Sequence, residues 1–176
     1  MNHLLRLTWL LLTAPFRKPL ADMLQPSRLC MRVWPTDLDI LMHMNNGVYL
    51  SLLDLGRIDL LLKARAYFKI TRKGMYPVVA SEMIRFRKSL RPFQAFEILT
   101  KMHGWDEKFF YLRQDFVVKG EIHASALIKG CFLKKGGGKV TTKELFQVTE
   151  MQPHENVSSA IKSMELIKSL EEELRD

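Results

Sequence analysis

Two aspartates, a histidine and two asparagines precede the most apolar stretch of this sequence, and their side chains can do chemistry. They are Asp37, Asp39, His43, Asn45 and Asn46. A carboxylate can act as a general base or a nucleophile, and an imidazole can transfer protons. The same residue types are common in turns and helix caps, so their grouping alone does not establish a reaction centre.

The apolar stretch from Asn46 onward predicts a mostly buried helix with the polar segment at its start. Its apolar residues recur at helical spacing, and they are Val48, Tyr49, Leu52, Leu53, Leu55, Leu60 and Leu61. Asn45 and Asn46 are good N-cap residues, and Gly56 would let the helix approach another element closely. The first N–H groups of a helix lack intrahelical acceptors, so its start favours negative charge.

A strand over residues 29–35 precedes the polar segment, and four long segments after the helix alternate between apolar and polar residues. These segments span residues 76–88, 94–105, 108–120 and 121–138. One face of the first segment is expected to carry Val78, Ala80, Ile84 and Phe86. Short connections between the segments indicate an antiparallel meander. Small residues in the last segment, Ala124, Ala126 and Gly130, leave room on one face for the apolar helix.

Composition and charge limit the class of protein. The chain has 176 residues, which suits one domain, and 47% are hydrophobic, enough for one sizeable core. The net charge of +8 suits nucleic acid, anionic membranes or phosphate-bearing small molecules. No recognition helix or RNA-binding motif accompanies the charge, and the histidines follow no metal-ligand pattern, so we expect neither nucleic acid nor metal. Cys30 and Cys131 are expected to be buried and reduced, which favours a cytoplasmic location.

The central domain is expected at residues 23–150, and helices are expected at both ends of the chain. The segment LLRLTWLLLTAPF would be a helix about 20 Å long, too short for a hydrocarbon core of about 30 Å. We expect this N-terminal extension, residues 1–22, to pack on the domain or on a partner; peripheral membrane contact is the alternative. Residues 141–148 and 151–176 predict two helices, the second with an apolar stripe.

The segment DLDILMHMNNGVYL resembles the D-x-D-x-x-G-H-V-N-N-x-x-Y signature of the hotdog thioesterases, the group of 4-hydroxybenzoyl-CoA and acyl-carrier-protein thioesterases. The segments RVWPTD, GWDEKFFYL and RFRKSLRPFQAFE are most similar to the branch named after thioesterase superfamily member six. The similarity extends over residues 29–133. Met42 stands where the family usually has glycine, a departure that bears on the loop conformation.

The resemblance implies an α+β hotdog fold, in which an antiparallel sheet of about five strands wraps a long central helix, with extra terminal helices. It implies an acyl-CoA thioesterase that needs no cofactor and forms a homodimer or higher homo-oligomer with active sites at the interface. Asp39 falls at the position of the catalytic carboxylate, as general base or nucleophile. The backbone N–H near Asn46 falls at the position that polarises the carbonyl.

Further site residues follow from the same resemblance, each with an alternative. His43 is a catalytic candidate or a residue that orients the loop. Asp54 lies where many members carry an acidic residue on the central helix, or it forms a salt bridge with Arg57. Residues expected on the substrate side are Asn45, Tyr49, Arg85 and Arg87. The arginines are proposed from their charge, which suits the coenzyme A phosphates, and solvated surface charge is their alternative; Asn45 is also expected to cap the helix. Tyr49 has the core as its alternative, and Asp37 is expected to be structural.

Three functional classes remain open at this point. The first is an acyl-CoA thioesterase acting on a coenzyme A or carrier-protein thioester. The second is a catalytically weak hotdog protein that binds acyl thioesters or lipids. The third is a membrane-associated scaffold that uses the N-terminal helix. The acyl chain length does not follow from the sequence.

Overall fold

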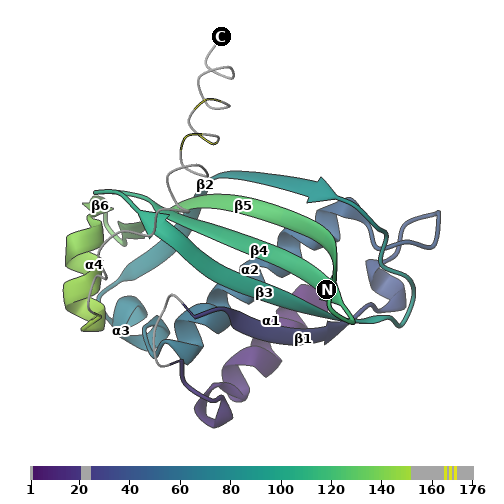
Figure 1. The fold of residues 1–176 in the computed structure, drawn as a ribbon. Helices are drawn as coiled ribbons and strands as arrows, with labels where there is room; N and C mark the ends of the chain where they lie inside the picture. Colours follow the sequence, from purple (N-terminus) through teal and green to yellow (C-terminus); the bar gives the residue numbers. More distant parts are fainter. Residues whose placement is uncertain (1, 21–24, 152–164, 166, 168, 170–176) are drawn as a thin grey trace.

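The computed structural model describes residues 2–20, 25–151, 165, 167 and 169, which form one curved sheet with helices against it (Figure 1). The helices are α1 (Asn2–Leu12), α2 (Asn46–Lys63), α3 (Tyr67–Arg72) and α4 (Thr142–Thr149), with 3₁₀ turns η1 (Ala14–Phe16) and η2 (Pro35–Asp37). The strands are β1 (Ser27–Arg32), β2 (Met75–Phe86), β3 (Ala95–Trp105), β4 (Phe110–Val118), β5 (Glu121–Lys134) and β6 (Lys139–Val140). This is the expected α+β arrangement of a long helix and an antiparallel sheet.

The strand order in the sheet is β1-β3-β4-β5-β2, and the short β6 also pairs with β5. Strands β3, β4 and β5 form the expected meander. The expectation is wrong for β2, which pairs with β5 and not with β3. The alternation of apolar residues fixes which face a strand buries, but it does not fix which strands are neighbours. Strands β1 and β2 are therefore the two edges of the sheet.

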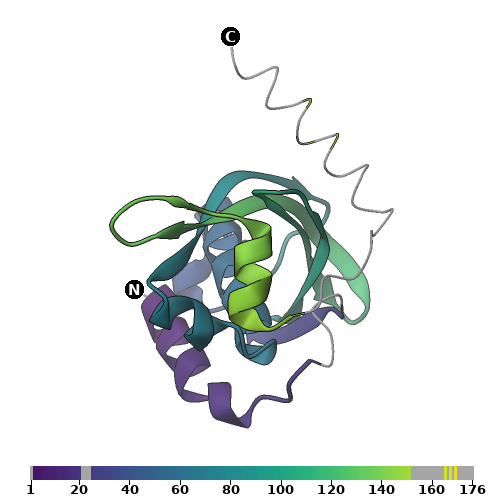
Figure 2. The same cartoon turned by 90° about the vertical axis from the view of Figure 1, so that its left-hand side faces the viewer.

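Helix α2 lies in the concave face of the sheet, and Figure 2 shows the sheet curled around it with α4 across one end. The expected close approach at Gly56 is confirmed, because a Cβ there would lie 2.6 Å from Gln114 Nε2 and 2.8 Å from Thr100 Oγ1. Gln114 is fully buried and donates to the Leu53 carbonyl (3.0 Å) and to Thr100 Oγ1 (2.9 Å). The helix thus packs on a polar pair whose hydrogen bonds are satisfied.

Strand β2 departs from the expected alternation at a β-bulge between Val79 and Ser81. One inserted residue moves the following side chains to the other face of a strand. The expectation of unbroken alternation over residues 78–86 is therefore wrong. Beyond the bulge, Glu82 pairs with the fully buried Ile128 and faces the core side of the sheet.

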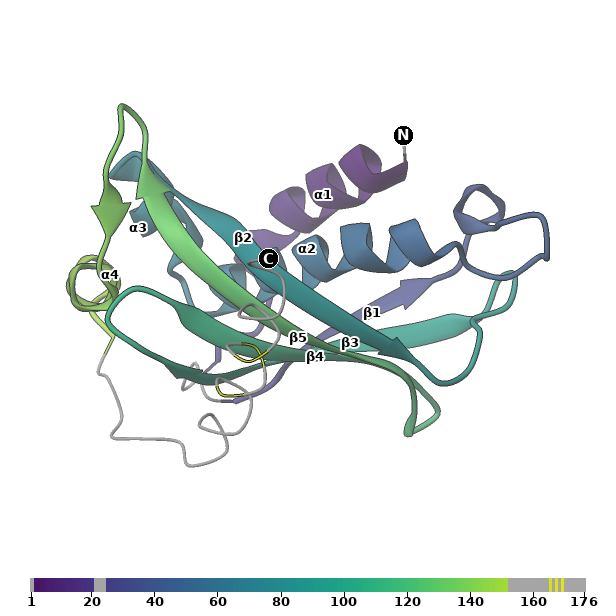
Figure 3. The same ribbon diagram turned by 90° about the horizontal axis from the view of Figure 1, so that it is seen from above.

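The N-terminal extension packs on the domain, as expected, and α1 lies against α2 on the side away from the sheet (Figure 3). Leu10 is buried in the main core. Two ion pairs hold the extension, Arg6 with Asp37 at 2.6 Å and Arg17 with the fully buried Asp59 at 2.5 Å. Among the described residues, no helix is long and apolar enough to cross a membrane.

The remaining expectations concern the cysteines and the C-terminal segment. Cys131 is buried as expected, but Cys30 is exposed, because it alternates with the inward-facing Leu29 on the edge strand β1. Helix α4 confirms the helix expected at residues 141–148. The expected C-terminal helix lies mostly outside the described residues, of which Glu165, Ile167 and Ser169 are helical.

Candidate functional site

The polar segment before α2 forms a loop that hydrogen bonds hold against the start of the helix. The side-chain carboxylate of Asp37 accepts a hydrogen bond from the Trp34 N–H (2.8 Å), and the backbone carbonyl of Asp37 accepts one from the Asn45 N–H (2.8 Å). The same carboxylate is buried and paired with Arg6 of α1 at 2.6 Å. Asp37 is therefore structural, as expected, and it joins α1 to the loop.

The carboxylate of Asp39 is held through one oxygen. Its Oδ1 accepts from the N–H groups of Leu41 (2.8 Å) and His43 (3.2 Å), and its own N–H donates to the His43 carbonyl (2.8 Å). Within the part of the chain that the structure describes, no donor contacts Oδ2 and no cation pairs with this carboxylate. Asp39 therefore orders the turn and still leaves one carboxylate oxygen available.

The tip of this loop is strained and apolar. Met42, at the usual glycine position, has a φ of 58°, in the left-handed region that costs a non-glycine residue roughly 1–2 kcal/mol. The loop thus keeps a glycine-like backbone conformation despite the substitution. Ile40, Leu41 and Met42 are all exposed, Ile40 at 98%. Three consecutive exposed apolar residues indicate a surface that another molecule covers.

Helix α2 begins directly after this loop, with Asn45 as its N-cap, as expected. Asn45 Oδ1 accepts from the Gly47 N–H (2.8 Å). Asn46 is the first helical residue, and no acceptor for its backbone N–H is found among the described residues. An unpaired N–H at the positive end of a helix is suited to stabilise an oxyanion.

Tyr49, one turn into α2, lies in the core and not on the substrate side. Its side chain is 2% exposed, and its ring makes edge contacts with Phe86 and Phe116. Its Oη accepts from the Leu90 N–H (3.2 Å), and the Leu90 carbonyl accepts from the Met44 N–H (2.9 Å). Burial raises the pKa of Tyr49, although the Leu90 hydrogen bond lowers it. The expectation that Tyr49 contacts the substrate is therefore replaced by its alternative, a role in the core, where Tyr49 positions the loop through Leu90.

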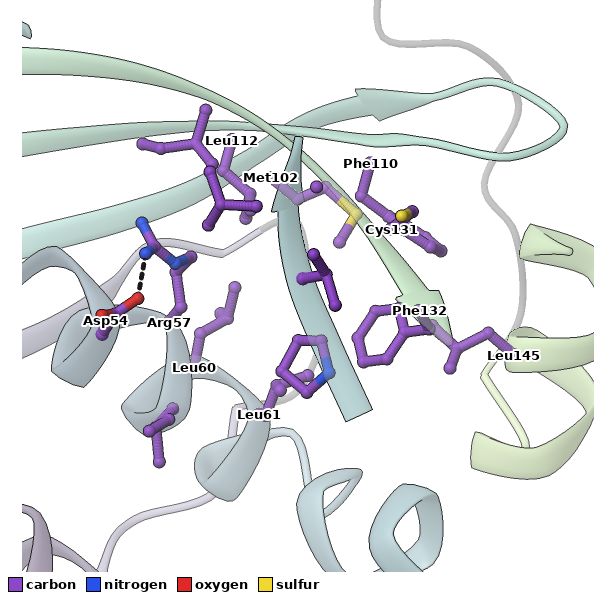
Figure 4. A pocket seen from close by; sticks show the side chains of 16 residues that line it. Asp54, Arg57, Leu60, Leu61, Met102, Phe110, Leu112, Cys131, Phe132 and Leu145 are labelled. Atoms are coloured by element: carbon purple, nitrogen blue, oxygen red, sulfur yellow. Dashed lines mark hydrogen bonds and ion pairs between the residues drawn. The ribbon is translucent and has the colours of Figure 1, made fainter. Parts of the chain in front are cut away.

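A second group of charged side chains lies along α2, at an apolar cavity of about 160 Å³ (Figure 4). Asp54 forms the ion pair with Arg57 that was its alternative role, and Arg57 also donates to Gln114 Oε1 (3.0 Å). The Asp54 side chain is 53% exposed, whereas Arg57 is mostly buried. The rest of the lining is apolar and includes Leu60, Leu61, Met102, Phe110, Leu112 and Ile128.

Glu82 of β2 belongs to this second group, and the sequence analysis missed it. Its Oε2 lies 3.7 Å from Arg57 Nη1. This oxygen is buried, and no hydrogen-bond donor for it is found among the described residues. Burial raises the pKa of Glu82; the Arg57 charge lowers it and the Asp54 charge raises it. The available signal was its position, because Glu82 alternates with Ala80 and Ile84 on the face of the strand that was expected to pack on the apolar helix.

Arg85 and Arg87 lie near the end of β2 and are exposed. The backbone of Arg87 is fixed by its N–H, which donates to the His123 carbonyl (2.8 Å). Figure 3 places this end of β2 at the same end of the molecule as the loop before α2. The arginines are therefore on the side of the molecule where Asp39 lies.

The structure divides the expected site residues between two parts of α2. Asp39, His43, Asn45 and Asn46 gather at the helix start. Asp54 lies eight residues after Asn46, about 12 Å along the helix axis, beside Arg57 and Glu82. Within the described ranges, no group of three metal-ligating side chains lies together.

Comparisons with known proteins agree with this architecture. The family model of the thioesterase-like superfamily matches residues 33–161. Protein THEM6 of Danio rerio is 38% identical over 132 residues, which cover 72% of this chain and 62% of that protein. The chain therefore spans about six tenths of the length of this curated relative.

Solved structures share the fold at lower identity. YbaW, a probable thioesterase from Escherichia coli, is 24% identical with a TM-score of 0.64, covering 70% of this chain and 96% of that one. A gentisyl-coenzyme A thioesterase is 16% identical with a TM-score of 0.64, covering 69% and 99%. At such identities these likenesses concern the hotdog fold alone.

Proposed function

Because this chain belongs to the thioesterase-like superfamily, we propose that it hydrolyses acyl-coenzyme A thioesters to a free acid and a thiol. The reaction centre in this proposal is the loop before α2. Asp39 acts there as general base or nucleophile, and the backbone N–H of Asn46 polarises the thioester carbonyl. The reaction requires no cofactor, because water is the second substrate.

The chemistry assigns a separate task to each group. As general base, Asp39 takes a proton from the water that attacks the carbonyl carbon; the carbon–sulfur bond then breaks, and the leaving thiolate takes up that proton. As nucleophile, Asp39 attacks the same carbon, the thiolate leaves and an anhydride forms; water hydrolyses the anhydride to the free acid and supplies the proton of the thiol. In both routes negative charge develops on the carbonyl oxygen. The N–H of Asn46 and the helix dipole stabilise that charge without reorganisation.

One observation carries this proposal. Asp39 Oδ2 and the Asn46 N–H, neither of which has a partner among the described residues, belong to the same hydrogen-bonded loop and helix start. The Oδ1 contacts to Leu41 and His43 fix the carboxylate, so that little conformational entropy is lost when a substrate arrives.

Other residues of this region take supporting roles in the proposal. His43 orients Asp39 through its backbone, and its imidazole remains a candidate for proton transfer. Asn45 caps the helix and presents its exposed amide beside the thioester. Arg85 and Arg87 supply positive charge for the coenzyme A phosphates.

We further propose a homodimer that forms along β2. This strand has 12 residues and pairs on one side only within the described part of the sheet. Long unpaired edges are usually covered, because their free N–H and C=O groups attract another strand. The exposed residues Ile40, Leu41 and Met42 support the same proposal, since a second copy would bury them.

A second candidate role is peripheral membrane contact through α1. Its outer face is apolar and exposed, with Leu4, Leu5, Trp9 and Leu12, and Phe16 follows in η1. Exposed apolar residues with nearby basic residues such as Lys18 suit the interface of an anionic membrane. This role adds to the packing of α1 on α2 and does not replace it.

A thiol-release assay over acyl-CoA substrates of increasing chain length tests the proposed activity. We expect turnover well above the uncatalysed rate for at least one chain length. Binding of acyl-CoA without release of thiol would contradict the proposal and favour a hotdog protein that only binds acyl thioesters.

A further inference from the structure

One side chain of the N-terminal extension, Arg6 of α1, reaches the base of the loop that carries Asp39. A single nitrogen of its guanidinium, Nη2, donates to the Asp37 carboxylate (2.6 Å) and to the backbone carbonyl of Arg32 (3.1 Å). Arg32 ends strand β1, and Asp37 ends the 3₁₀ turn η2 that leads into the loop. Arg6 therefore ties the base of the loop to the end of β1.

This contact is mostly shielded from water. The Arg6 side chain is 12% exposed and the Asp37 side chain is 4% exposed. An exposed ion pair contributes little to stability, whereas breaking a buried pair leaves an uncompensated charge and is strongly destabilising. Asp37 also accepts from the Trp34 N–H (2.8 Å), so its carboxylate has two donors that fix its place.

The backbone connects Asp37 to the rest of the loop. The Asp37 carbonyl accepts from the Asn45 N–H (2.8 Å), and the next residues inward, Leu38 and Met44, form an antiparallel bridge. These contacts close the loop that carries Asp39, and Asn45 is also the N-cap of α2. A shift of Asp37 would therefore move Asp39 relative to the start of α2.

The loop has a second anchor, which belongs to the core. The Met44 N–H donates to the Leu90 carbonyl (2.9 Å), and the Leu90 N–H donates to Tyr49 Oη (3.2 Å). This anchor lies within residues 33–161, the range that the family model matches, whereas Arg6 lies outside that range. The extension thus supplies a contact to the loop from outside the matched domain.

We propose that Arg6 is a positioning residue for the reaction at Asp39, so that α1 orders the reaction centre in addition to stabilising the domain. Arg6 touches no reacting group. It acts through Asp37, whose place sets the position of Asp39 relative to the Asn46 N–H. The inference rests on the proposed thioesterase function for its effect on turnover, but not for its effect on the loop.

Arg6→Met tests the effect on turnover with an acyl-CoA that the wild type hydrolyses. Methionine keeps much of the apolar stem of arginine but donates no hydrogen bond. Because a misplacement of about 1 Å can cost about 10²-fold in rate, we expect kcat to fall by about 10- to 100-fold. KM should change much less, since Arg6 does not contact the substrate. Rates are compared well below the Tm of each variant, where the protein is folded.

Arg17→Met is the matched control, because Arg17 belongs to the same extension and pairs with the fully buried Asp59 at 2.5 Å. Asp59 lies 13 residues after Asn46, about 20 Å along the helix axis, and it keeps its ion pair with Lys63. We expect a lower Tm and a kcat close to that of wild type. Equal losses of kcat in the two variants would overturn the proposal.

A double variant, Arg6→Met with Asp37→Asn, decides the question if Arg6→Met does not fold. Asparagine removes the uncompensated buried charge and can still accept from the Trp34 N–H. The tie from α1 to the loop is absent, so kcat should stay low while Tm recovers. A wild-type kcat in the double variant would overturn the proposal, because the buried charge alone would then explain the loss.

Amide hydrogen exchange of the full chain measures the order of the loop without requiring activity. The N–H groups to follow are those of Leu41, His43 and Asn45, each of which donates within the loop. In Arg6→Met their exchange should be about tenfold faster than in Arg17→Met, as expected for local opening. Equal exchange at these groups in the two variants would contradict a tie between α1 and the loop.

The outcomes separate this inference from the proposed activity. If the wild type releases no thiol from any acyl-CoA but Arg6→Met alone loosens the loop, the ordering of the loop by α1 stands and the thioesterase proposal fails. If the wild type hydrolyses acyl-CoA and Arg6→Met keeps its kcat, the activity stands and the positioning role of Arg6 fails.

Discussion

Two groups of carboxylates lie beside α2, one in the loop before its start and one along its length, and they differ in which groups of the protein contact the carboxylate oxygens. At the helix start, backbone N–H groups hold Asp39 through one oxygen, and within the described residues no cation neutralises it. Along the helix, Arg57 engages Asp54 directly, and Glu82 lies 3.7 Å from the same guanidinium. A carboxylate held by dipoles keeps its charge and a free lone pair, whereas a carboxylate held by arginine has much of its charge compensated.

This difference suggests that one region carries out the reaction and the other binds ligand. The region around Asp39 suits proton abstraction or attack, because no cation among the described residues pairs with its carboxylate and the loop leads into the start of α2. The region around Arg57 suits binding, because its charges are fixed by one another at the wall of an apolar cavity.

The largest effect is expected from the helix start. Asn46→Pro removes one backbone N–H, and proline is tolerated at the first helical position. Asn45 already has the extended conformation (φ −61°, ψ 138°) that precedes proline. We expect kcat to fall by about 10²–10³, the usual loss on removal of one oxyanion donor, with little change in Tm.

The control for this variant is Asn46→Ala, which keeps the N–H and removes only the side chain. It should retain most of the activity. Equal losses in Asn46→Pro and Asn46→Ala would assign the effect to the amide side chain, and the helix N–H would lose its proposed role.

Removal of residues 1–20 should destabilise the domain. It deletes the buried Leu10, whose burial alone contributes about 1.5–3 kcal/mol. It also removes Arg6 and Arg17, the arginine partners of Asp37 and Asp59, although Asp59 keeps its ion pair with Lys63. Thermal unfolding measures this loss as a fall in Tm. Strong, salt-insensitive liposome binding that disappears on truncation, with Tm unchanged, would show that the extension is a membrane anchor and not a packed helix.

Gly56→Ala should destabilise the chain by about 1–3 kcal/mol, the usual cost of overpacking. The added methyl would lie 2.6 Å from Gln114 Nε2, on the residue that also binds Arg57. At an open helical position the same change stabilises by about 0.5–1 kcal/mol. Denaturant unfolding therefore tests the sign, and a more stable Gly56→Ala variant would mean that α2 and the sheet are not in close contact.

The smallest effect is expected from Glu82→Gln, and it depends on pH. Burial raises the pKa of Glu82 in the folded chain above the ordinary value of 4.5. Its contribution to stability is therefore fully present below the unfolded pKa and is lost as pH rises through the folded pKa. The variant should be more stable than wild type at neutral pH, and the difference in Tm should diminish below about pH 4. A difference that grows on acidification would contradict the raised pKa.

Much of the fold could be predicted from local sequence, because it depends on local signals. Asn45 capped the helix as its type suggested, and Gly56 marked the close approach to the sheet. The inward faces of β3, β4 and β5 followed from alternation over most of each strand. The pairing is irregular between Met102 and Gly104 in β3 and between Phe116 and Val117 in β4, and the alternation did not reveal this.

The remainder depended on contacts between distant residues. The pairing of β2 with β5 and the bulge between Val79 and Ser81 follow from the sheet register, which no local pattern encodes. The Arg6 and Asp37 pair joins residues 31 positions apart. The loop around Asp39 could be proposed as a site because its motif is contiguous in the sequence. The group of Asp54, Arg57 and Glu82 could not, because only the fold brings its helix and its strand together.

The catalytic role of Asp39 is tested most directly by kcat for Asp39→Asn and Asp54→Asn, measured side by side on one acyl-CoA that the wild type hydrolyses. The amide keeps the size and much of the hydrogen bonding of aspartate, but it is neither basic nor nucleophilic. We expect Asp39→Asn to lose on the order of 10² or more in kcat, with KM and fold little changed, and Asp54→Asn to lose less. Near wild-type turnover by a correctly folded Asp39→Asn variant would contradict this assignment, and Asp54 would become the catalytic candidate.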